Sequence, residues 1–437
     1  MEKIPVPVHI GDEFIREAVE AAIAQTLQPA AVERAYPGHF TVTADGEHFG
    51  RENTWPGLDS WEMAGAYLLL GRERLVLDYF DFVEASQRQD GNVPFAIFPA
   101  EEPPGGLDSF LRGLRYPEDA YTFEPRARVG QPVHSDMSER KWIGLFDHWQ
   151  PKANPLTVLA PTCFILTASE IMGRTKSESW LREKIGSVDR AGRYLLSRKS
   201  ENGLISGAGF YVECPPRNQW DGVTQCYVVK AFRDLAGLHR MVGDPRTAGL
   251  WTARAEELGA VFQRTFWRGD HFAEYVHPEH GVVDFHGLSD VNWAAIVSGV
   301  ATEDQVERVW PLLVGEKSLW HGDMPTQLVS MPYGYREWEL NEPLPFEKST
   351  GPLYDVAAMG RVWFLESMAC LRTGQHDRLW DSVRKVCRMG QRHGWYWYER
   401  YHPLQVWDVF PAGPRGYCEY PAILVRVVLG NPDVFSK

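Results

Sequence analysis

Three acidic side chains stand among aromatic residues at points where helices are expected to begin or a chain turn is expected. Asp59 lies in TWPGLDSWEM, Asp221 in CPPRNQWDGVTQCY, and Glu399 in WYWYERYHP. A protonated carboxylic acid can donate a proton to a leaving oxygen, and an ionised carboxylate can activate water or attack as a nucleophile. Two such groups on either side of a glycosidic bond are what its hydrolysis requires. These residues therefore indicate acid–base chemistry on a sugar.

Each of the three acids also has a structural interpretation. Asp221 precedes Gly-Val-Thr-Gln, a good helix start, so the sequence fits an N-cap and a catalyst equally well. Asp59 and Glu62 have the spacing of a capping box, although Asp59 could instead accept two sugar hydroxyls. Glu399 could be a solvated loop residue paired with Arg400, but its four aromatic neighbours favour a functional role.

Aromatic residues are abundant, with 17 Trp, 17 Tyr and 21 Phe, and many lie in loops beside Gly, Pro, Asp or His. Pyranose rings have apolar faces and polar edges, so flat aromatic side chains with a few fixed polar groups suit them. Any single tryptophan is more simply explained by packing, but the whole set favours a saccharide site. His134, His148 and His286 could line that site.

The sequence lacks the motifs of several other classes of enzyme and binding protein. The sequence has no GxSxG elbow, no glycine-rich phosphate loop and no HExxH-like metal spacing, so we expect neither cofactor nor metal. A formal charge of −13 without a basic cluster disfavours nucleic acid. The N-terminus lacks a secretion signal, no apolar run is long enough for a bilayer, and the six cysteines form no CxxC pair. We expect a cytoplasmic protein with small buried thiols. The sequence contains no pattern that indicates an oligomeric state.

Helical periodicity recurs in pairs joined by short turns. The expected pairs are 59–71 with 73–89, 157–172 with 177–198, 222–242 with 245–267, 289–300 with 302–315, and 355–373 with 376–389. The last helix, 416–429, lacks a downstream partner, which the amphipathic stretch 12–26 could supply. Asp244 with Pro245, and Thr302 with Gln305, are expected to start two of the second helices.

The first helix of each pair is apolar on nearly all faces and the second is amphipathic, as an inner ring wrapped by an outer ring requires. We therefore expect an all-α protein, an (α/α)6 toroid in a single domain over 1–437. The alternative is a helical solenoid or two bundles, but no fixed-period repeat supports a solenoid. The long insertions 91–155 and 317–353 are expected to wall a pocket, and 38–49 and 203–213 alternate like short β-hairpins over one end.

Five segments, in order, resemble the six-hairpin glycosidases, in particular glycoside hydrolase family sixty-three and the bacterial glucosylglycerate hydrolases. They are TWPGLDSWEMAGAYLLLG, SQRQDGNVPF, NQWDG, TGPLYDVAAM, and YERYHP followed by GYCEYPAILV. The resemblance runs from about residue 50 to 430. It implies that Trp55 and Asp59 hold a terminal glucose and that Gln87 contacts the sugar. We also place Trp61 in the sugar site.

The resemblance further implies that Asp221 is the general acid, beside Trp220, and that Glu399 is the general base. The chain departs from the family where Lys348, Ser349 and Thr350 replace a Tyr-Trp-Arg. Tyr354 replaces a tryptophan and Glu419 stands where a tryptophan is usual, and we place both in the sugar site. These departures affect the glucose preference more than the mechanism.

The expected activity is hydrolysis of a small saccharide, exo-acting and inverting, on an α-glucoside or related oligosaccharide. Burial against Trp220 would keep Asp221 protonated, and inversion requires the two carboxyl groups to lie roughly 6.5–9.5 Å apart. A sugar epimerase or isomerase on the same toroid would instead use facing histidines. A non-catalytic saccharide-binding protein would bury at least one of the two acids in a structural salt bridge.

Overall fold

The structure is a computed structural model, and it describes residues 9–31, 33, 36–44, 52–58, 60–99, 121–126, 142–150, 154–155, 158–207, 217, 219–320, 336, 338, 357–405 and 408–436. In parts of the strands only the backbone is described.

Helices form most of this chain, in the pairs expected from the periodicity. The first members are α3 (Ser60–Leu69), α6 (Leu159–Thr175), α8 (Gly222–Met241), α10 (Asp290–Ser298), α13 (Gly360–Thr373) and α15 (Glu419–Leu429). The second members are α4 (Glu73–Glu84), α7 (Glu178–Ser197), α9 (Pro245–Phe266), α11 (Glu303–Gly315) and α14 (His376–Arg392).

The first members are buried on all sides, and the second members on one face. In α3, nine of ten residues are buried, from Ser60 to Leu68. In α14 the buried positions, such as Leu379, Val383 and Val386, recur at helical spacing, while the other face is solvated. Burial therefore follows the alternation read from the sequence.

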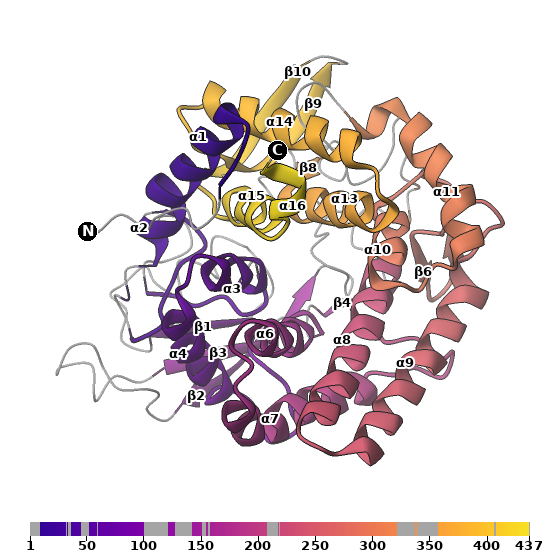
Figure 1. Ribbon diagram of the computed structural model, residues 1–437. Helices are drawn as coiled ribbons and strands as arrows, with labels where there is room; N and C mark the ends of the chain where they lie inside the picture. Colours follow the sequence, from indigo (N-terminus) through magenta and orange to yellow (C-terminus); the bar gives the residue numbers. More distant parts are fainter. Residues whose placement is uncertain are drawn as a thin grey trace.

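The buried helices pack in an order that returns to its start. Each contacts the next, from α3 through α6, α8, α10 and α13 to α15, and α15 packs against α3 (Figure 1). The second members lie outside them, as α7 does on α6 and α9 on α8. The mostly helical class is confirmed, and the assignment to an (α/α)6 toroid stays a prediction.

The N-terminal helix α1 (Glu13–Ala22) packs against α14 and α15, which confirms that 12–26 supplies the missing partner. It continues through η1 (Ile23–Leu27) and α2 (Gln28–Ala30). Asp12 caps α1 by accepting the N–H groups of Phe14 and Ile15, and its other oxygen pairs with Arg384 of α14 at 2.8 Å.

Two further helix starts form as expected. Asp244 accepts the N–H of Thr247 at 3.0 Å, at the start of α9. Thr302 and Gln305 form a reciprocal capping box on α11. Each such cap stabilises a helix by about 1 kcal/mol, so the sequence places these boundaries locally.

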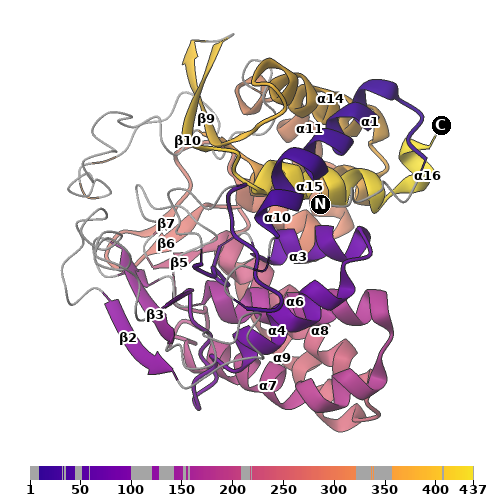
Figure 2. The same ribbon diagram turned by 90° about the vertical axis from the view of Figure 1, so that its left-hand side faces the viewer.

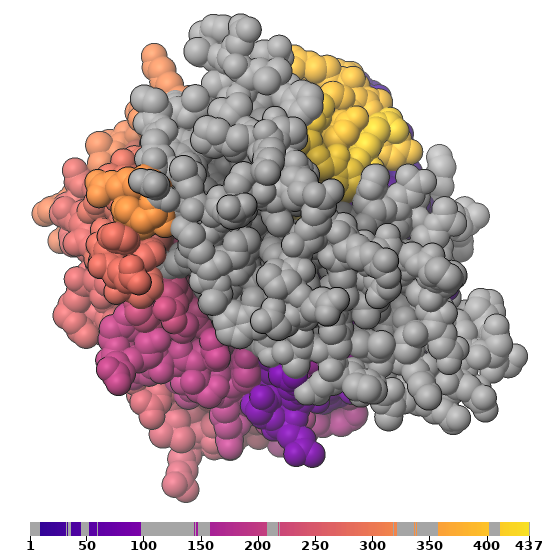
Figure 3. All heavy atoms as spheres, turned by 180° about the vertical axis from the view of Figure 1, so that it is seen from behind, coloured from indigo at the N-terminus to yellow at the C-terminus, as the bar shows by residue number. Residues whose placement is uncertain are grey.

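Strands gather at the end of the molecule where the buried helices begin (Figure 2). The antiparallel strands β5 (Trp220–Asp221), β6 (Tyr275–His277) and β7 (Gly281–Val283) lead into α8 and α10. A second sheet, β10-β9-β8, contains β8 (Ala358–Met359), β9 (Tyr398–Gln405) and β10 (Asp408–Arg415) and leads into α13 and α15. Figure 3 shows this end face-on, with residues 158–207 in magenta and 219–320 in pink to orange along one side.

The third sheet lies within 91–155, the insertion that is expected to wall a pocket. It contains β1 (Ala96–Pro99), β2 (Tyr121–Arg126), β3 (Trp142–Gln150) and β4 (Asn154–Pro155), with β3 between β1 and β2. The hairpins expected at 38–49 and 203–213 are described only as far as residues 44 and 207, where single bridges join Thr43 to Tyr417 and Gly207 to Trp220. Most of 317–353 lies outside the described residues, which here are 317–320, with η4 (Lys317–Leu319), and residues 336 and 338.

Side chains from five buried helices meet at the centre of the bundle. Trp61 of α3 lies edge-on to Tyr227 of α8 and Phe364 of α13. Arg426 of α15 lies over the rings of Trp61 and Phe364, at 4.8 and 4.6 Å from their centroids, and pairs with Glu170 of α6. Beyond this cluster, at the end away from the strands, is a hollow of about 450 Å³ lined by residues of α3, α6, α13 and α15.

One continuous core of buried hydrophobic residues extends from Ile10 to Phe435, in the short C-terminal helix α16 (Pro432–Phe435). Five cysteines are buried free thiols, as expected, and Cys214 lies outside the described residues. Among the helices that the structure describes, none is both long and apolar enough to cross a bilayer.

Candidate functional site

Asp221 is a helix cap at the strand-bearing end. It lies at the junction of β5 and α8, with extended backbone, and its Oδ2 accepts the N–H of Thr224 at 2.8 Å. The N–H of the next residue, Gly222, donates to the carbonyl of Glu274, so β5 holds this corner against β6. The capping interpretation of Asp221 is therefore correct, and it leaves the second carboxylate oxygen, Oδ1, for another contact.

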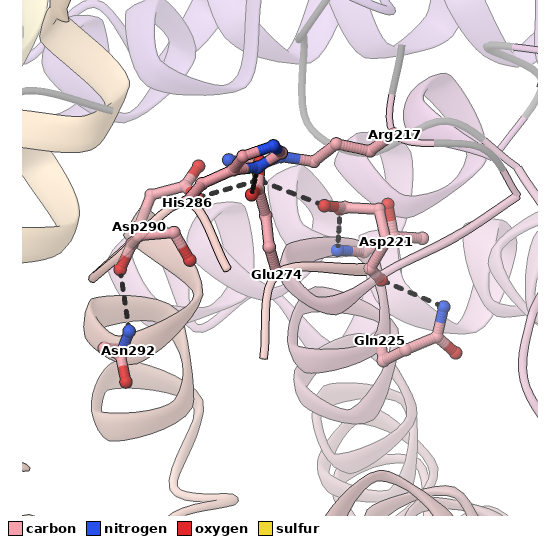
Figure 4. A network of polar contacts seen from close by, with 9 residues as sticks. Arg217, Asp221, Gln225, Glu274, His286, Asp290 and Asn292 are labelled. Carbon is pink, nitrogen blue, oxygen red and sulfur yellow. Dashed lines mark hydrogen bonds and ion pairs between the residues drawn. The ribbon is translucent and has the colours of Figure 1, made fainter. Parts of the chain in front are cut away.

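That contact is the centre of a buried polar network (Figure 4). Nη1 of Arg217 lies 3.1 Å from Oδ1 of Asp221 and 2.7 Å from Oδ1 of Asp290, and its Nε donates to Oε1 of Glu274 at 2.8 Å. Glu274 is in turn hydrogen-bonded through Oε2 to Nδ1 of His286 at 2.5 Å. One guanidinium thus faces three carboxylates.

All members of this network are buried, so its charges are poorly screened. Burial raises the pKa of Asp290 to about 7; Arg217 opposes that rise, and the charge of Asp221 adds to it. Burial also acts to raise the pKa of Glu274, but Arg217 and His286 outweigh it and hold that pKa below its usual range. Near neutral pH the network therefore holds both ionised and protonated carboxyl groups.

Glu399 lies on strand β9, which corrects the expectation of a loop. Its side chain is 9% exposed and its Oε1 lies 3.3 Å from Nη1 of Arg400, so the predicted pairing with Arg400 forms but is not solvated. Gly413 on β10 passes so close that a β-carbon there would come 2.2 Å from Oε2 of Glu399. The local structure thus confines this carboxylate.

Asp221 and Glu399 lie at the same end of the helices. Asp221 begins α8, while β9 pairs with β8 in the register Met359 with Arg400, at the start of α13. Helix α10 packs between α8 and α13 and begins with Asp290. Strands β5 and β9, which contain the two acids, are both on the strand-bearing side seen in Figure 2.

The predicted aromatic residues of the sugar site are mostly enclosed. Trp55 is 1% exposed and lies edge-on to Phe95, and Trp61 is 3% exposed in the central cluster. Trp220 is half-buried in β5, and its indole N–H donates to Oγ of Ser200 at 2.9 Å. Asp59 and Tyr354 lie outside the described residues. The roles of these side chains toward a sugar stay predictions.

Gln87 and Glu419 make contacts that hold elements together. Gln87 donates to the carbonyls of Gly91 and Ser187 and accepts from Arg190, which links the end of α4 to α7. Glu419 is fully buried and accepts three hydrogen bonds at the start of α13 from Gly360 and Arg361. Structural roles account for the contacts of both side chains, and their assignment to the sugar site stays a prediction.

Reasoning from the sequence missed Arg217, Glu274 and Asp290, and it named His286 only as a residue that could line a pocket. Arg217 stands four residues before Asp221, and Asp290 precedes an apolar run like an ordinary helix start. Nothing in the sequence near Arg217 or Asp290 indicates that the two residues are in contact. They meet only because folding brings the β6, β7 and α10 segments to α8. Within the described residues, no group of His, Cys, Asp or Glu side chains is arranged to hold a metal ion.

No model of a known protein family matches the sequence, and no curated protein matches it. Solved structures match in fold. The GH63 mannosylglycerate hydrolase from Thermus thermophilus, in complex with glucose, superposes with a TM-score of 0.61 at 14% identity, over 94% of this chain and 99% of that one.

Two rhamnosidases match as well. The GH78 rhamnosidase of Bacillus sp. GL1 gives a TM-score of 0.60 at 15% identity over 97% of this chain, and the rhamnosidase from Klebsiella oxytoca gives 0.58 at 11% over 98%. This chain spans 36% and 65% of their respective lengths. The neighbours have folds of the six-hairpin glycosidase type, so the resemblance noted in the motifs is confirmed at the level of fold.

Proposed function

We propose that this chain is a glycoside hydrolase, built as one (α/α)6 catalytic domain and acting with inversion on a small saccharide. The closed order of contacts among α3, α6, α8, α10, α13 and α15 supports the toroid. The glycosidases among the structural neighbours support the reaction class. An exo-acting α-glucosidase on a small glucoside is the substrate class that the sequence motifs favour.

The observation that carries the proposal is the surplus of buried carboxylates around Arg217. Asp221, Glu274 and Asp290 face one guanidinium and one imidazole at the starts of α8 and α10. Burying three carboxylates is costly for stability alone, and perturbed acids of this kind concentrate at catalytic sites. Glu399 is a further confined carboxylate at the same end.

In the proposed reaction Asp221 is the general acid and Glu399 the general base. Asp221 gives its proton to the glycosidic oxygen as the bond from that oxygen to the anomeric carbon breaks. Glu399 takes a proton from water, whose oxygen forms the new bond to the anomeric carbon from the opposite face. Trp55, Asp59, Trp61, Gln87, Trp220, Tyr354 and Glu419 are the residues we propose to surround the sugar.

Replacing either acid by its amide tests the assignment. We expect Asp221→Asn and Glu399→Gln each to lower kcat by about 10²–10⁴-fold on aryl and disaccharide glycosides, because neither amide transfers the proton. NMR of the first sugar anomer released should show inversion. The control is Asp189→Asn, which alters a buried carboxylate paired with Arg193 of α7 and should leave kcat unchanged.

Two results would contradict parts of this proposal. Full activity of Glu399→Gln would exclude it as the base and make Glu419 or Asp59 the next candidate. Release of the retained anomer would indicate a covalent intermediate, which requires the carboxyl groups to be only about 5 Å apart.

One observation favours a second candidate, a non-catalytic saccharide-binding protein. Asp221 caps α8 and forms a fully buried ion pair with Arg217, as that alternative requires. It predicts calorimetric binding of a sugar without any release of product. Since His286 is engaged with Glu274, the described contacts give no support to the histidine chemistry of an epimerase.

A further inference from the structure

Two carboxylates share one nitrogen of Arg217. Oδ1 of Asp221 and Oδ1 of Asp290 lie 3.1 and 2.7 Å from the same Nη1, and the three side chains are 0%, 4% and 2% exposed. Nε of Arg217 is already bound to Glu274. The positive charge of Arg217 is therefore shared among Asp221, Asp290 and Glu274, and Asp221 and Asp290 share the same nitrogen.

The two carboxylates cannot move apart easily. Asp221 is fixed as the cap of α8 and Asp290 is the first residue of α10, and these helices pack against each other. Like charges held close together in a poorly solvated place disfavour joint ionisation, so the two acids compete for Arg217.

We propose that Asp290 is a positioning residue of the hydrolase, which shares Arg217 with Asp221 and so leaves Asp221 able to hold the proton that the reaction transfers. This inference rests on the proposed function. Without the carboxylate of Asp290, Asp221 shares the charge of Arg217 with Glu274 alone, and the stronger pull of the guanidinium favours the ionised form of Asp221, which cannot protonate a leaving oxygen.

The other charged and titratable groups around Asp290 do not replace it. Glu274, which precedes β6, is bound to both Arg217 and His286, so cationic or polar partners already occupy its two oxygens. Burial, together with the charges of Asp221 and Asp290, raises the pKa of the Cys226 thiol on α8, which therefore stays neutral.

The test is the pH profile of kcat/KM for Asp290→Asn. In the bell-shaped profile of a two-carboxylate hydrolase, the alkaline limb reports loss of the proton from the acid and the acid limb reports protonation of the base. We expect the alkaline limb to move to lower pH by about one unit or more, while the acid limb, set by Glu399, stays in place. Asp189→Asn, the buried control on α7, should move neither limb.

A second variant, Asp290→Ser, and a second measurement, NMR titration of Asp221, test the same inference independently. Asp290→Ser removes the same carboxylate and keeps a residue suited to a helix start, should the asparagine variant fail to fold. With ¹³Cγ-labelled aspartate, the NMR signal of Asp221, identified by its loss in Asp221→Asn, should titrate at lower pH in the Asp290 variants than in the natural protein.

An Asp221 signal that titrates at the same pH with and without Asp290 overturns the inference, as does an unmoved alkaline limb. If the natural protein cleaves no glycoside, the proposed function fails, whereas the NMR titration still shows whether Asp290 controls the proton of Asp221. The two failures are thereby distinguished.

Discussion

Gly413 sets the space available to the candidate base. It has a φ of +78°, a conformation that favours glycine, and a β-carbon there would meet Glu399 at Oε2 and at Cβ, at 2.2 and 2.7 Å. The side chain of Glu399 can lie between β9 and β10 in this way only because residue 413 has no side chain.

Substituting Gly413→Ala should therefore displace Glu399 and strain the hairpin. We expect kcat/KM to fall at least about tenfold and the unfolding free energy to fall by about 1–2 kcal/mol. Steady-state kinetics and urea unfolding measure the two effects. The control, Gly249→Ala, alters an exposed helical glycine whose new methyl would meet no described atom within 4 Å outside its own stretch of helix, and it should stabilise α9 slightly. Unchanged activity in Gly413→Ala would mean that Glu399 takes no part in the reaction in this position.

The residues of the candidate site were only partly predictable from the sequence. Asp221 and Glu399 could be singled out because each stands among aromatic residues or at a helix start. Arg217 and Asp290 could not be linked to them, because ion pairing between residues 217 and 290 depends on α8 and α10 packing side by side. A single sequence contains no local pattern for a contact of that kind.

At the scale of elements, Glu419 links α15 to the start of α13 through hydrogen bonds and an ion pair. Its buried carboxylate accepts the backbone N–H groups of Gly360 and Arg361 and the Nε of Arg361. Four N–H groups at a helix start lack partners within the helix, and a carboxylate there also interacts favourably with the helix dipole.

We expect Glu419→Gln to lower the unfolding free energy by about 3 kcal/mol, because Arg361 would stay buried without its counter-ion. Urea denaturation followed by circular dichroism checks this value. Glu20→Gln, which removes the exposed 3.9 Å pair with Arg16, should change stability by less than about 0.5 kcal/mol. If both variants were equally stable, the contacts of Glu419 would contribute little to joining the two helices.

Helices were predictable and strands were not, for a physical reason. Helix starts such as Thr302 with Gln305, and the apolar stripes that follow, depend on neighbours three or four residues apart. Strand β3 pairs with β1 across more than forty residues, and β9 is stabilised by β8 as well as by β10. From the sequence, the aromatic run at 395–401 is therefore interpreted as a loop, although its last four residues begin strand β9.

At the scale of the whole molecule, the first described helix completes the packing of the last ones. Ile15 of α1 is fully buried, on the helix that packs on α14 and α15, and belongs to the core that extends to Phe435. Stability of the N-terminal helix is thus tied to that of the C-terminal helices.

Ile15→Ala should lower the unfolding free energy by about 2–4 kcal/mol, because it leaves a cavity in this continuous core. The loss should appear in one transition, seen at the same denaturant concentration by circular dichroism and by tryptophan fluorescence. Leu250→Ala, at a position 61% exposed, should have little effect. Separate transitions for the two probes would show that α1 unfolds independently of the rest.

The central cluster of Trp61, Tyr227, Phe364 and Arg426 joins helices on different sides of the bundle. Rings and a guanidinium from α3, α8, α13 and α15 interlock between the strand-bearing end and the hollow at the other end. From the contacts of these four described side chains we expect a sugar released at the strand-bearing end to leave on the side from which substrate enters, and not along the axis. The product sugar would then have to leave before the next substrate molecule could bind. We therefore expect the free product sugar to be a competitive inhibitor.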